Sequence, residues 1–212
     1  MNSLLRRTVL LSLTAFVSVF AIATWLLTRP LPEIPTPPVD EAQDITTDDL
    51  MEYQRPVYKR LAEVSIKSIS PEPDEVYRLI LLPTFDKPVV VRIAKRGDRV
   101  QLTKKIFDGV GGYGLDKMGK LAVDESRDIA PEDFTQLRAL LTEAEFWELP
   151  VRNPDDEAVN DGALWFVDGR DHGVTRSVVR IIPNPRLLGA CRFMLRIAEL
   201  EPDYTGYWSS GS

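Results

Sequence analysis

Cysteine and histidine are almost absent from this sequence, which has only Cys191 and His172 in 212 residues. A single cysteine excludes an intrachain disulfide and a zinc site built on several thiolates. Any metal site would have to consist mostly of carboxylate and carbonyl oxygens, which suit calcium or magnesium. We expect neither a cofactor nor a resident metal ion.

Basic residues are fewer than acidic residues, 26 against 32, and the formal net charge is −6. A protein that binds nucleic acid without sequence specificity needs a basic surface to displace counterions from the phosphates. We therefore expect no nucleic-acid partner. The balance of 44% apolar and 27% charged residues is typical of a folded globular protein with one core.

The short motifs of common enzyme families are missing, since the chain has no G-x-S-x-G, S-x-x-K, H-E-x-x-H or G-x-x-x-x-G-K-[ST] sequence. Gly109, Gly111 and Gly114 match G-x-G-x-x-G. The dinucleotide fingerprint requires a parallel βαβ unit, however, and no helical pattern follows these glycines. The alternative is that this glycine-rich loop, through Gly111, Gly112 and Tyr113, binds some other ligand with its backbone N–H groups.

Residues 8–28 form an uncharged and strongly apolar segment. At about 1.5 Å per residue, about 20 such residues cross the ~30 Å hydrocarbon core of a bilayer. Arg6 and Arg7 precede the segment and acidic residues follow it, so the positive-inside rule places residues 1–7 in the cytoplasm. The pattern predicts a single-pass signal anchor in the lipid bilayer of the cell inner membrane, with a periplasmic domain. The alternative is a signal peptide cleaved near Ala23, which would release a secreted or periplasmic protein.

Residues 29–45 are rich in proline, which favours an extended polyproline II conformation without internal hydrogen bonds. We interpret this segment as a stiff linker that marks a domain boundary. Residues 46–203 then form one α+β extracytoplasmic domain, and residues 204–212 form a flexible C-terminal tail.

Helical periodicity first appears directly after the linker. Thr46 or Thr47 is a suitable N-cap for a helix that extends to about Leu61, and Pro56 is expected to kink this helix. Two further helices are predicted, one from Pro131 to a stop before Pro150 and one over residues 186–200.

Short runs rich in β-branched and aromatic residues, separated by turn residues, predict strands. Strands joined by such short turns are antiparallel. We therefore predict an α+β fold, with a mainly antiparallel sheet of about five to six strands packed by two to three helices. The predicted strands cover residues 76–82, 89–94, 99–107, 120–126, 163–169 and 174–182.

The histidine lies in the sequence DGRDHG, between the last two predicted strands. Aspartate and glycine are the residues that a hairpin turn favours, so we expect His172 at the tip of a hairpin. The competing hypothesis is an extracytoplasmic hydrolase-like enzyme in which Asp161 and His172 act as acid and base near the loop of Gly111 and Gly112. That hypothesis requires the two side chains to converge on one pocket.

Arginines provide a second candidate site for ligand binding. Arg176 and Arg180 are four residues apart on one predicted strand and therefore share a face of the sheet. If Arg92 lies on a neighbouring strand of that face, the three arginines could hold a carboxylate or a phosphate through bidentate hydrogen bonds. The alternative is a solvated face on which they pair with the many acidic residues.

Two other features have simpler interpretations. An acidic cluster, formed by Asp155, Asp156, Glu157 and Asp161, lacks the spacing of an EF-hand loop. We expect a solvated loop there, with a loose calcium site as the alternative. Cys191 belongs to the apolar stripe of the last predicted helix, so we expect an inert core cysteine.

Four short motifs occur in a recognisable order: GGYG at Gly111 to Gly114, FWELP at Phe146 to Pro150, NDGALWFVDG at Asn160 to Gly169, and VVRIIPNP before the last helix. In this order the chain resembles a group of uncharacterised bacterial exported or membrane-anchored domains with GGYG, FWxLP and DGxxW motifs. The resemblance implies a location in the cell envelope, and an envelope protein as a possible partner, but no activity. Together these patterns favour a non-catalytic binding or interaction module.

Overall fold

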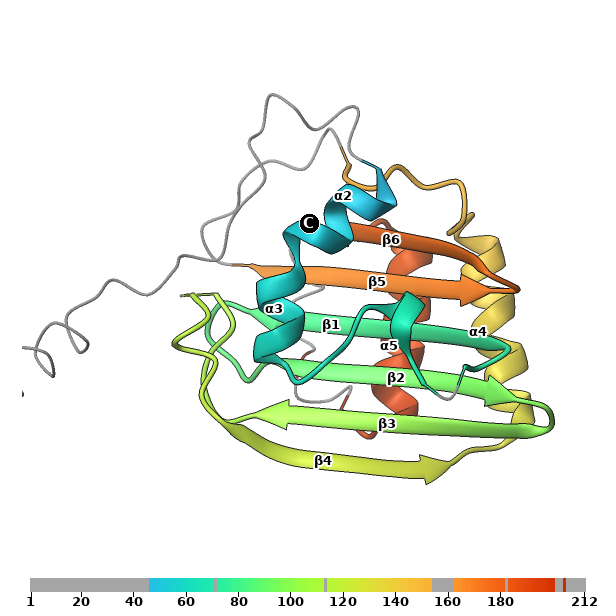
Figure 1. The fold of residues 1–212 in the computed structure, drawn as a ribbon, viewed down its shortest axis with the longest axis horizontal. Helices are drawn as coiled ribbons and strands as arrows, with labels where there is room; N and C mark the ends of the chain where they lie inside the picture. The colour runs from blue at the N-terminus through green and yellow to red at the C-terminus, as the bar shows by residue number, and fades with distance from the viewer. Residues whose placement is uncertain are drawn as a thin grey trace, which may run out of the picture. The chain divides into compact units, whose positions relative to one another are not determined.

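The computed structural model describes residues 46–70, 72–112, 114–153, 162–181, 183–200 and 204 (Figure 1). The predicted cytoplasmic N-terminus, anchor and linker lie outside the described residues, as do Tyr113, Asp161 and all of the predicted C-terminal tail except Tyr204. Within the described part of the chain, no helix is both long enough and apolar enough to span a membrane.

The fold is α+β, as predicted, and its centre is one six-stranded sheet with the strand order β4-β3-β2-β1-β5-β6. Every pair of neighbouring strands is antiparallel. The first four strands follow one another as a meander, and the last hairpin then adds β5 to the free edge of β1. The strands are β1 (Glu75–Pro83), β2 (Val89–Arg96), β3 (Arg99–Phe107), β4 (Leu121–Asp128), β5 (Ala163–Asp171) and β6 (Val174–Arg180).

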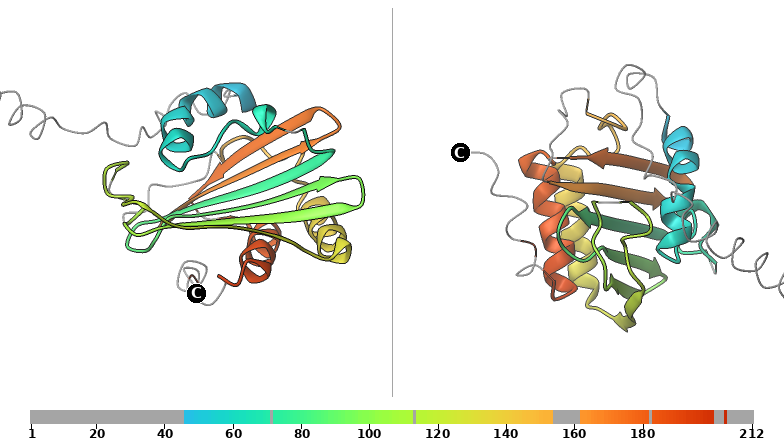
Figure 2. Two further views of the ribbon diagram at one scale, coloured as in Figure 1. Left: turned by 60° about the horizontal axis from the view of Figure 1, so that its bottom comes forward. Right: turned by 90° about the vertical axis from the view of Figure 1, so that its left-hand side faces the viewer.

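Helices lie against both faces of the sheet (Figure 2). One face is covered by α4 (Pro131–Glu143) and α5 (Pro185–Ile197), and the other by α2 (Thr47–Tyr53), α3 (Arg55–Arg60) and the short 3-10 helix η2 (Ile66–Ser68). The described residues thus contain four α-helices rather than the two to three that were predicted. The difference arises because the first predicted helix is interrupted at Gln54, which is the C-cap of α2 and the N-cap of α3.

The ends of α2 and α3 follow local rules. Thr46 caps α2, accepting a hydrogen bond from the backbone N–H of Asp49, and the Asp49 carboxylate in turn accepts one from the Thr46 backbone. Pro56 falls in the first turn of α3, where its missing N–H costs nothing because that donor would have no partner within the helix. The predicted kink at Pro56 is therefore a restart of the helix.

The two faces of the sheet differ in chemistry. Toward α4 and α5 the strands present apolar side chains, among them Leu79 of β1 and Trp165 of β5, which form one continuous core. Toward α2 and α3 the same strands present apolar side chains such as Ile80 and Phe166, but also Arg78 and Asp168. β5 is buried on both of its faces because helices cover both faces of the sheet.

Candidate functional site: a buried charge cluster beneath α2 and α3

Five charged side chains from five different segments meet between the sheet and the α2–α3 layer. We call them the buried charge cluster: Glu63 after α3, Arg78 of β1, Arg92 of β2, Lys105 of β3 and Asp168 of β5. The cluster holds three cations and two carboxylates. Buried charges are costly unless they are paired and hydrogen-bonded, so its internal contacts decide what it can do.

The first half of the cluster is the ion pair between Arg78 and Asp168. These residues are direct neighbours in the register of β1 and β5, and neither side chain is exposed to solvent. Arg78 donates from Nε (2.8 Å) and Nη2 (2.6 Å) to Oδ2 of Asp168. The hydroxyl of Ser177 donates to Oδ1, so both carboxylate oxygens are used. This geometry offsets much of the desolvation cost of the pair.

Tyr58 of α3 covers this pair. Its ring lies 4.5 Å from the guanidinium carbon of Arg78, a cation–π arrangement, and its hydroxyl donates to the side-chain oxygen of Gln54. Burial and the neighbouring Asp168 carboxylate raise the pKa of the Tyr58 hydroxyl above its usual value. Tyr58 therefore remains a neutral hydrogen-bond donor and is not prepared for acid–base chemistry.

The second half of the cluster is centred on Glu63. Its Oε2 accepts hydrogen bonds from Nη1 of Arg92 (2.7 Å) and Nη1 of Arg78 (3.1 Å), and its Oε1 lies 2.7 Å from Nζ of Lys105. Burial alone would raise the pKa of the Glu63 carboxyl, but Arg92, Arg78 and Lys105 hold it below its usual value. Glu63 is consequently a buried carboxylate that faces three cations.

A helix-ending turn delivers Glu63 to this position. After α3, Ala62 adopts a left-handed conformation (φ +49°), and the N–H of Glu63 bonds to the carbonyl of Tyr58 at 2.8 Å. This is the hydrogen bond of a Schellman motif, which turns the following side chain back onto the last turn of the helix. α4 and α5 end in the same way, but there the inserted residues are the apolar Phe146 and Leu200.

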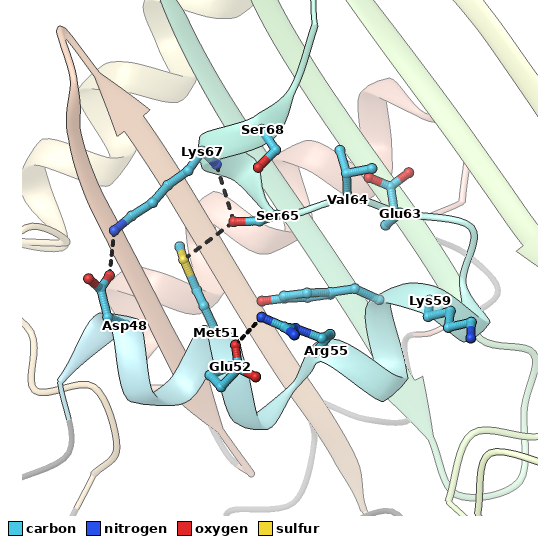
Figure 3. A pocket seen from close by; sticks show the side chains of 11 residues that line it. Asp48, Met51, Glu52, Arg55, Lys59, Glu63, Val64, Ser65, Lys67 and Ser68 are labelled. Atoms are coloured by element: carbon cyan, nitrogen blue, oxygen red, sulfur yellow. Dashed lines mark hydrogen bonds and ion pairs between the residues drawn. The ribbon is translucent and has the colours of Figure 1, made fainter.

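A groove lies above the cluster, between α2–α3 and the segment 63–68 (Figure 3). Its volume is about 620 Å³. Asp48 of α2 and Lys67 of η2 form an ion pair across it, and Arg55 pairs with Glu52 along its rim. The remaining lining residues are Met51, Tyr58, Lys59, Glu63, Val64, Ser65 and Ser68.

The three candidate arginines do not converge on one face of the sheet. Arg176 and Arg180 lie opposite Gly169 and Trp165 of β5 and so face α4 and α5, whereas Arg92 faces α2 and α3. Arg176 and Arg180 do share a face, as their spacing predicted. Arg180 is buried and donates to the carbonyls of Pro150 (2.8 Å) and Val151 (3.2 Å), so it fastens the chain after α4 to the sheet.

The glycine-rich loop packs closely against the end of β1. The N–H of Gly111 donates to the carbonyl of Pro83 at 2.9 Å. A Cβ atom at Gly111 would lie 2.7 Å from the backbone of Leu82, and one at Gly112 would lie 2.5 Å from Cα of Thr84. These glycines are therefore required by packing, and the Gly111 N–H that was considered for ligand binding is already used. Tyr113, the third residue of this candidate site, lies outside the described residues.

His172 occupies the hairpin turn between β5 and β6, as predicted, with a left-handed backbone (φ +44°) and a side chain that is 84% exposed. Gly162, the chain neighbour of Asp161, lies at the opposite end of the nine-residue strand β5, about 30 Å away. Asp161 itself is outside the described residues, so the structure places only the histidine of the hydrolase hypothesis.

Cys191 is fully buried in α5, as predicted for a core cysteine, and burial raises the pKa of its thiol to about 12. Over the described ranges, no group of three or more His, Cys, Asp or Glu side chains is arranged to hold a metal ion. Three members of the acidic cluster, Asp155, Asp156 and Glu157, lie outside these ranges together with Asp161.

Comparison with known proteins adds no assignment. No protein-family model matches the chain, and no curated protein is significantly similar to it. The resemblance to exported bacterial domains therefore stays a prediction.

Sequence reasoning identified only one of the five residues of the buried charge cluster, Arg92, and placed it in the wrong group. A signal was nevertheless present. Arg78 stands in VYRLILLP and Asp168 in ALWFVDG, and each is a charged residue within an otherwise apolar strand. A charge in a strand that is buried on both faces requires a buried partner, which makes such residues candidates for a network.

Proposed function

We propose that this chain is a single-pass protein of the cell inner membrane that presents residues 46–203 outside the cytoplasm as a non-catalytic binding module. The uncharged segment 8–28, preceded by Arg6 and Arg7, supports the anchor and its orientation. The resemblance to exported or membrane-anchored bacterial domains supports the location. Release after cleavage near Ala23 is the alternative, and it would leave the same domain in the periplasm.

The observation that carries the binding role is the groove between α2–α3 and the segment 63–68. Charged groups of both signs line its rim, and Met51 and Tyr58 contribute to its wall. Concave sites that combine apolar surface with a few placed polar groups are typical of ligand binding. The strongest concentration of charge in the described residues, by contrast, is buried and paired internally, which suits positioning and binding rather than proton transfer to a substrate. An envelope protein or a polar ligand of the envelope is the expected partner.

The buried thiol of Cys191 makes a topology test possible without removing the native cysteine. Glu132→Cys places a thiol at an exposed position of α4, and Ser3→Cys places one in the segment predicted to be cytoplasmic. In cells with a permeabilised outer membrane, a membrane-impermeant maleimide should label Glu132→Cys and leave Ser3→Cys unlabelled until lysis. The opposite pattern would reject the proposed orientation. The intact mass of the purified chain separates an uncleaved anchor from a chain that begins at Thr24.

The binding role is tested at the groove itself. A photo-crosslinking amino acid at Lys59, on the groove, should give a discrete adduct in intact cells, and the same amino acid at Glu132 on α4 serves as the matched control. An adduct at Lys59 that is absent at Glu132 supports the proposal. No adduct at Lys59, or the same adducts at both positions, contradicts it.

A further inference from the structure

The three cations of the buried charge cluster form an arrangement that a sheet does not support by itself. Arg78 lies directly opposite Arg92 in the register of β1 and β2, and Lys105 lies opposite Val90, two positions along β2 from Arg92. All three side chains project from the same face. Like charges placed opposite one another on a sheet are destabilising, so this cradle, formed by Arg78, Arg92 and Lys105, requires an anion.

Glu63, which lies outside the sheet, is the carboxylate that contacts all three cations. Asp168 of the sheet forms an ion pair with Arg78. Glu63 comes from the short connection between α3 and η2, so it can leave the cradle without any change in strand pairing. With Glu63 removed, Arg92 and Lys105 would lose the carboxylate that they share.

We propose that the cradle is an anion-binding site whose internal occupant is Glu63, and that a ligand carrying a carboxylate or a phosphate group takes the place of Glu63. This inference rests on the proposed binding role and names the chemistry of the ligand. Guanidinium and ammonium groups in this arrangement match the oxygens of either group, and a phosphate offers more charge and more acceptors than a carboxylate.

The cradle lies behind the segment that carries Glu63. The side chains of Glu63 and Arg78 are fully buried, whereas Arg92 is 22% exposed, and Glu63 is the member of the cluster that belongs to the lining of the groove. A ligand in the groove would therefore reach the cations as the segment that carries Glu63 moves away.

Between the buried apolar residues Leu61 and Ile66, residues 62–65 contact the sheet through polar groups. The ammonium of Lys105 donates to the carbonyl of Ala62, and Nη1 of Arg78 donates to the carbonyl of Val64 at 2.6 Å. Val64 is 51% exposed, and Ala62 holds a left-handed conformation that an alanine adopts at some cost. Both bonds depend on the same cations that a ligand would engage, so binding of the ligand and release of the segment are coupled.

The test uses the full-length chain in detergent, with potassium phosphate compared against potassium chloride at equal ionic strength. Hydrogen exchange of the amides of residues 62–65 should increase in a saturable manner as phosphate replaces Glu63. Glu63→Gln removes the internal anion while keeping the size of the side chain. If Glu63 fills the cradle more than nine-tenths of the time, the variant should bind phosphate at least about tenfold more tightly, because the competing occupant is gone.

Two neighbouring lysines supply a matched control. Lys105 belongs to the cradle, whereas Lys104 points to the other face of β3 and pairs with Glu125 at 3.2 Å. Lys105→Met should abolish or strongly weaken the phosphate effect, and Lys104→Met should leave it unchanged. Equal phosphate affinities in the two variants would overturn the proposal. This comparison also decides the question if Glu63→Gln does not fold.

Three further measurements distinguish a soluble anion from a lipid headgroup as the ligand. Succinate tests a soluble carboxylate, and nanodiscs containing phosphatidylglycerol are compared with nanodiscs of phosphatidylcholine only. A response confined to phosphatidylglycerol would identify a lipid headgroup, whereas a response to phosphate or succinate would identify a soluble ligand. No response to any of these anions in the wild type and in Glu63→Gln would overturn the anion site, while the topology and crosslinking results would still decide the proposed function independently.

Discussion

Arg78 and Asp168 face each other across β1 and β5 with both side chains fully buried, and two guanidinium nitrogens of Arg78 converge on a single oxygen of Asp168. The pair lies in the middle of the sheet, beneath Tyr58, where water cannot compensate a lost charge. The α2–α3 side of the sheet therefore holds a partly ionic core, whereas the core on the α4–α5 side is mainly apolar.

Breaking this pair should be costly. Asp168→Ala removes the closer of the two counterions of buried Arg78, leaving only Glu63 at 3.1 Å, and should lower the free energy of unfolding by about 3–5 kcal/mol. Asp128→Ala removes an exposed partner of Arg99 and should cost less than about 1 kcal/mol. Urea unfolding followed by tryptophan fluorescence measures both. Equal costs for the two variants would show that the buried pair has no special role.

A double variant sharpens this prediction. Arg78→Met combined with Asp168→Leu removes both charges together and should destabilise the protein less than Asp168→Ala alone, because no unpaired charge remains. A double variant that is less stable than Asp168→Ala would mean that the two charges are not coupled.

The glutamates at the end of α4 should respond in opposite directions to the same substitution. Glu145 has a left-handed backbone (φ +51°) after the helix, which glycine adopts freely, so Glu145→Gly should raise the free energy of unfolding by about 0.5–1 kcal/mol. Glu143 is the last residue of the helix, and Glu143→Gly should lower it by a similar amount. Both side chains are exposed, so their changes in thermal unfolding can be compared directly.

Replacement by alanine should change the free energy of unfolding in opposite directions at two glycines. A Cβ at Gly169 would lie 2.6 Å from Cε1 of Phe146, so Gly169→Ala should destabilise the protein by about 1–3 kcal/mol through overpacking. Gly189 is inside α5 with no atom within 4 Å of an added Cβ, so Gly189→Ala should stabilise it by up to about 1 kcal/mol. Phe146→Leu should partly rescue Gly169→Ala if the ring is the obstacle.

The ionisation of Glu63 should contribute to the pH dependence of the free energy of unfolding. Its folded pKa lies below the ordinary value of 4.5, so the folded state favours the carboxylate. The resulting stabilisation is fully present above the unfolded pKa and is lost as the pH falls through the folded pKa. The stability difference between the wild type and Glu63→Gln should therefore be constant above about pH 5 and shrink below about pH 4.5.

Thermal unfolding between pH 3 and pH 7 measures this difference, and Glu132→Gln at an exposed position of α4 is the control. A difference that persists unchanged down to pH 3 would show that the charge of Glu63 does not contribute to stability.

Most of the secondary structure could be predicted because its causes are local. The capping box of Thr46 and Asp49, the proline at the start of α4 and the β-branched runs of the strands are all contained in a few consecutive residues. The exception is the break at Gln54. Gln54 is buried and accepts a hydrogen bond from the hydroxyl of Tyr58. The ring of Tyr58 in turn packs on Arg78 of the sheet, a tertiary contact that the local sequence pattern does not contain.

The candidate site could not be predicted to the same extent because it depends on which strands become neighbours. Whether Arg92 meets Arg176 or Glu63 is decided by the pairing of β1 with β5, which joins two hairpins that are about 80 residues apart in the sequence. A shift of one residue in that register would exchange the two faces of a whole strand. The sequence therefore left open whether the three arginines share a face, whereas the hairpin position of His172 depends only on local turn residues.

By itself, the sequence determined the α+β class, the antiparallel hairpins, the helix starts and the place of His172 in a turn, because spacing and capping act over a few residues. Only the tertiary structure decided that Arg78 and Asp168 meet, that Arg180 fastens the chain after α4, and that Glu63 enters the core. The physical reason is that a buried charge is tolerated only beside a partner of opposite charge. In this fold the partner comes from a distant segment, and only the packing of the sheet and its helices brings the two together.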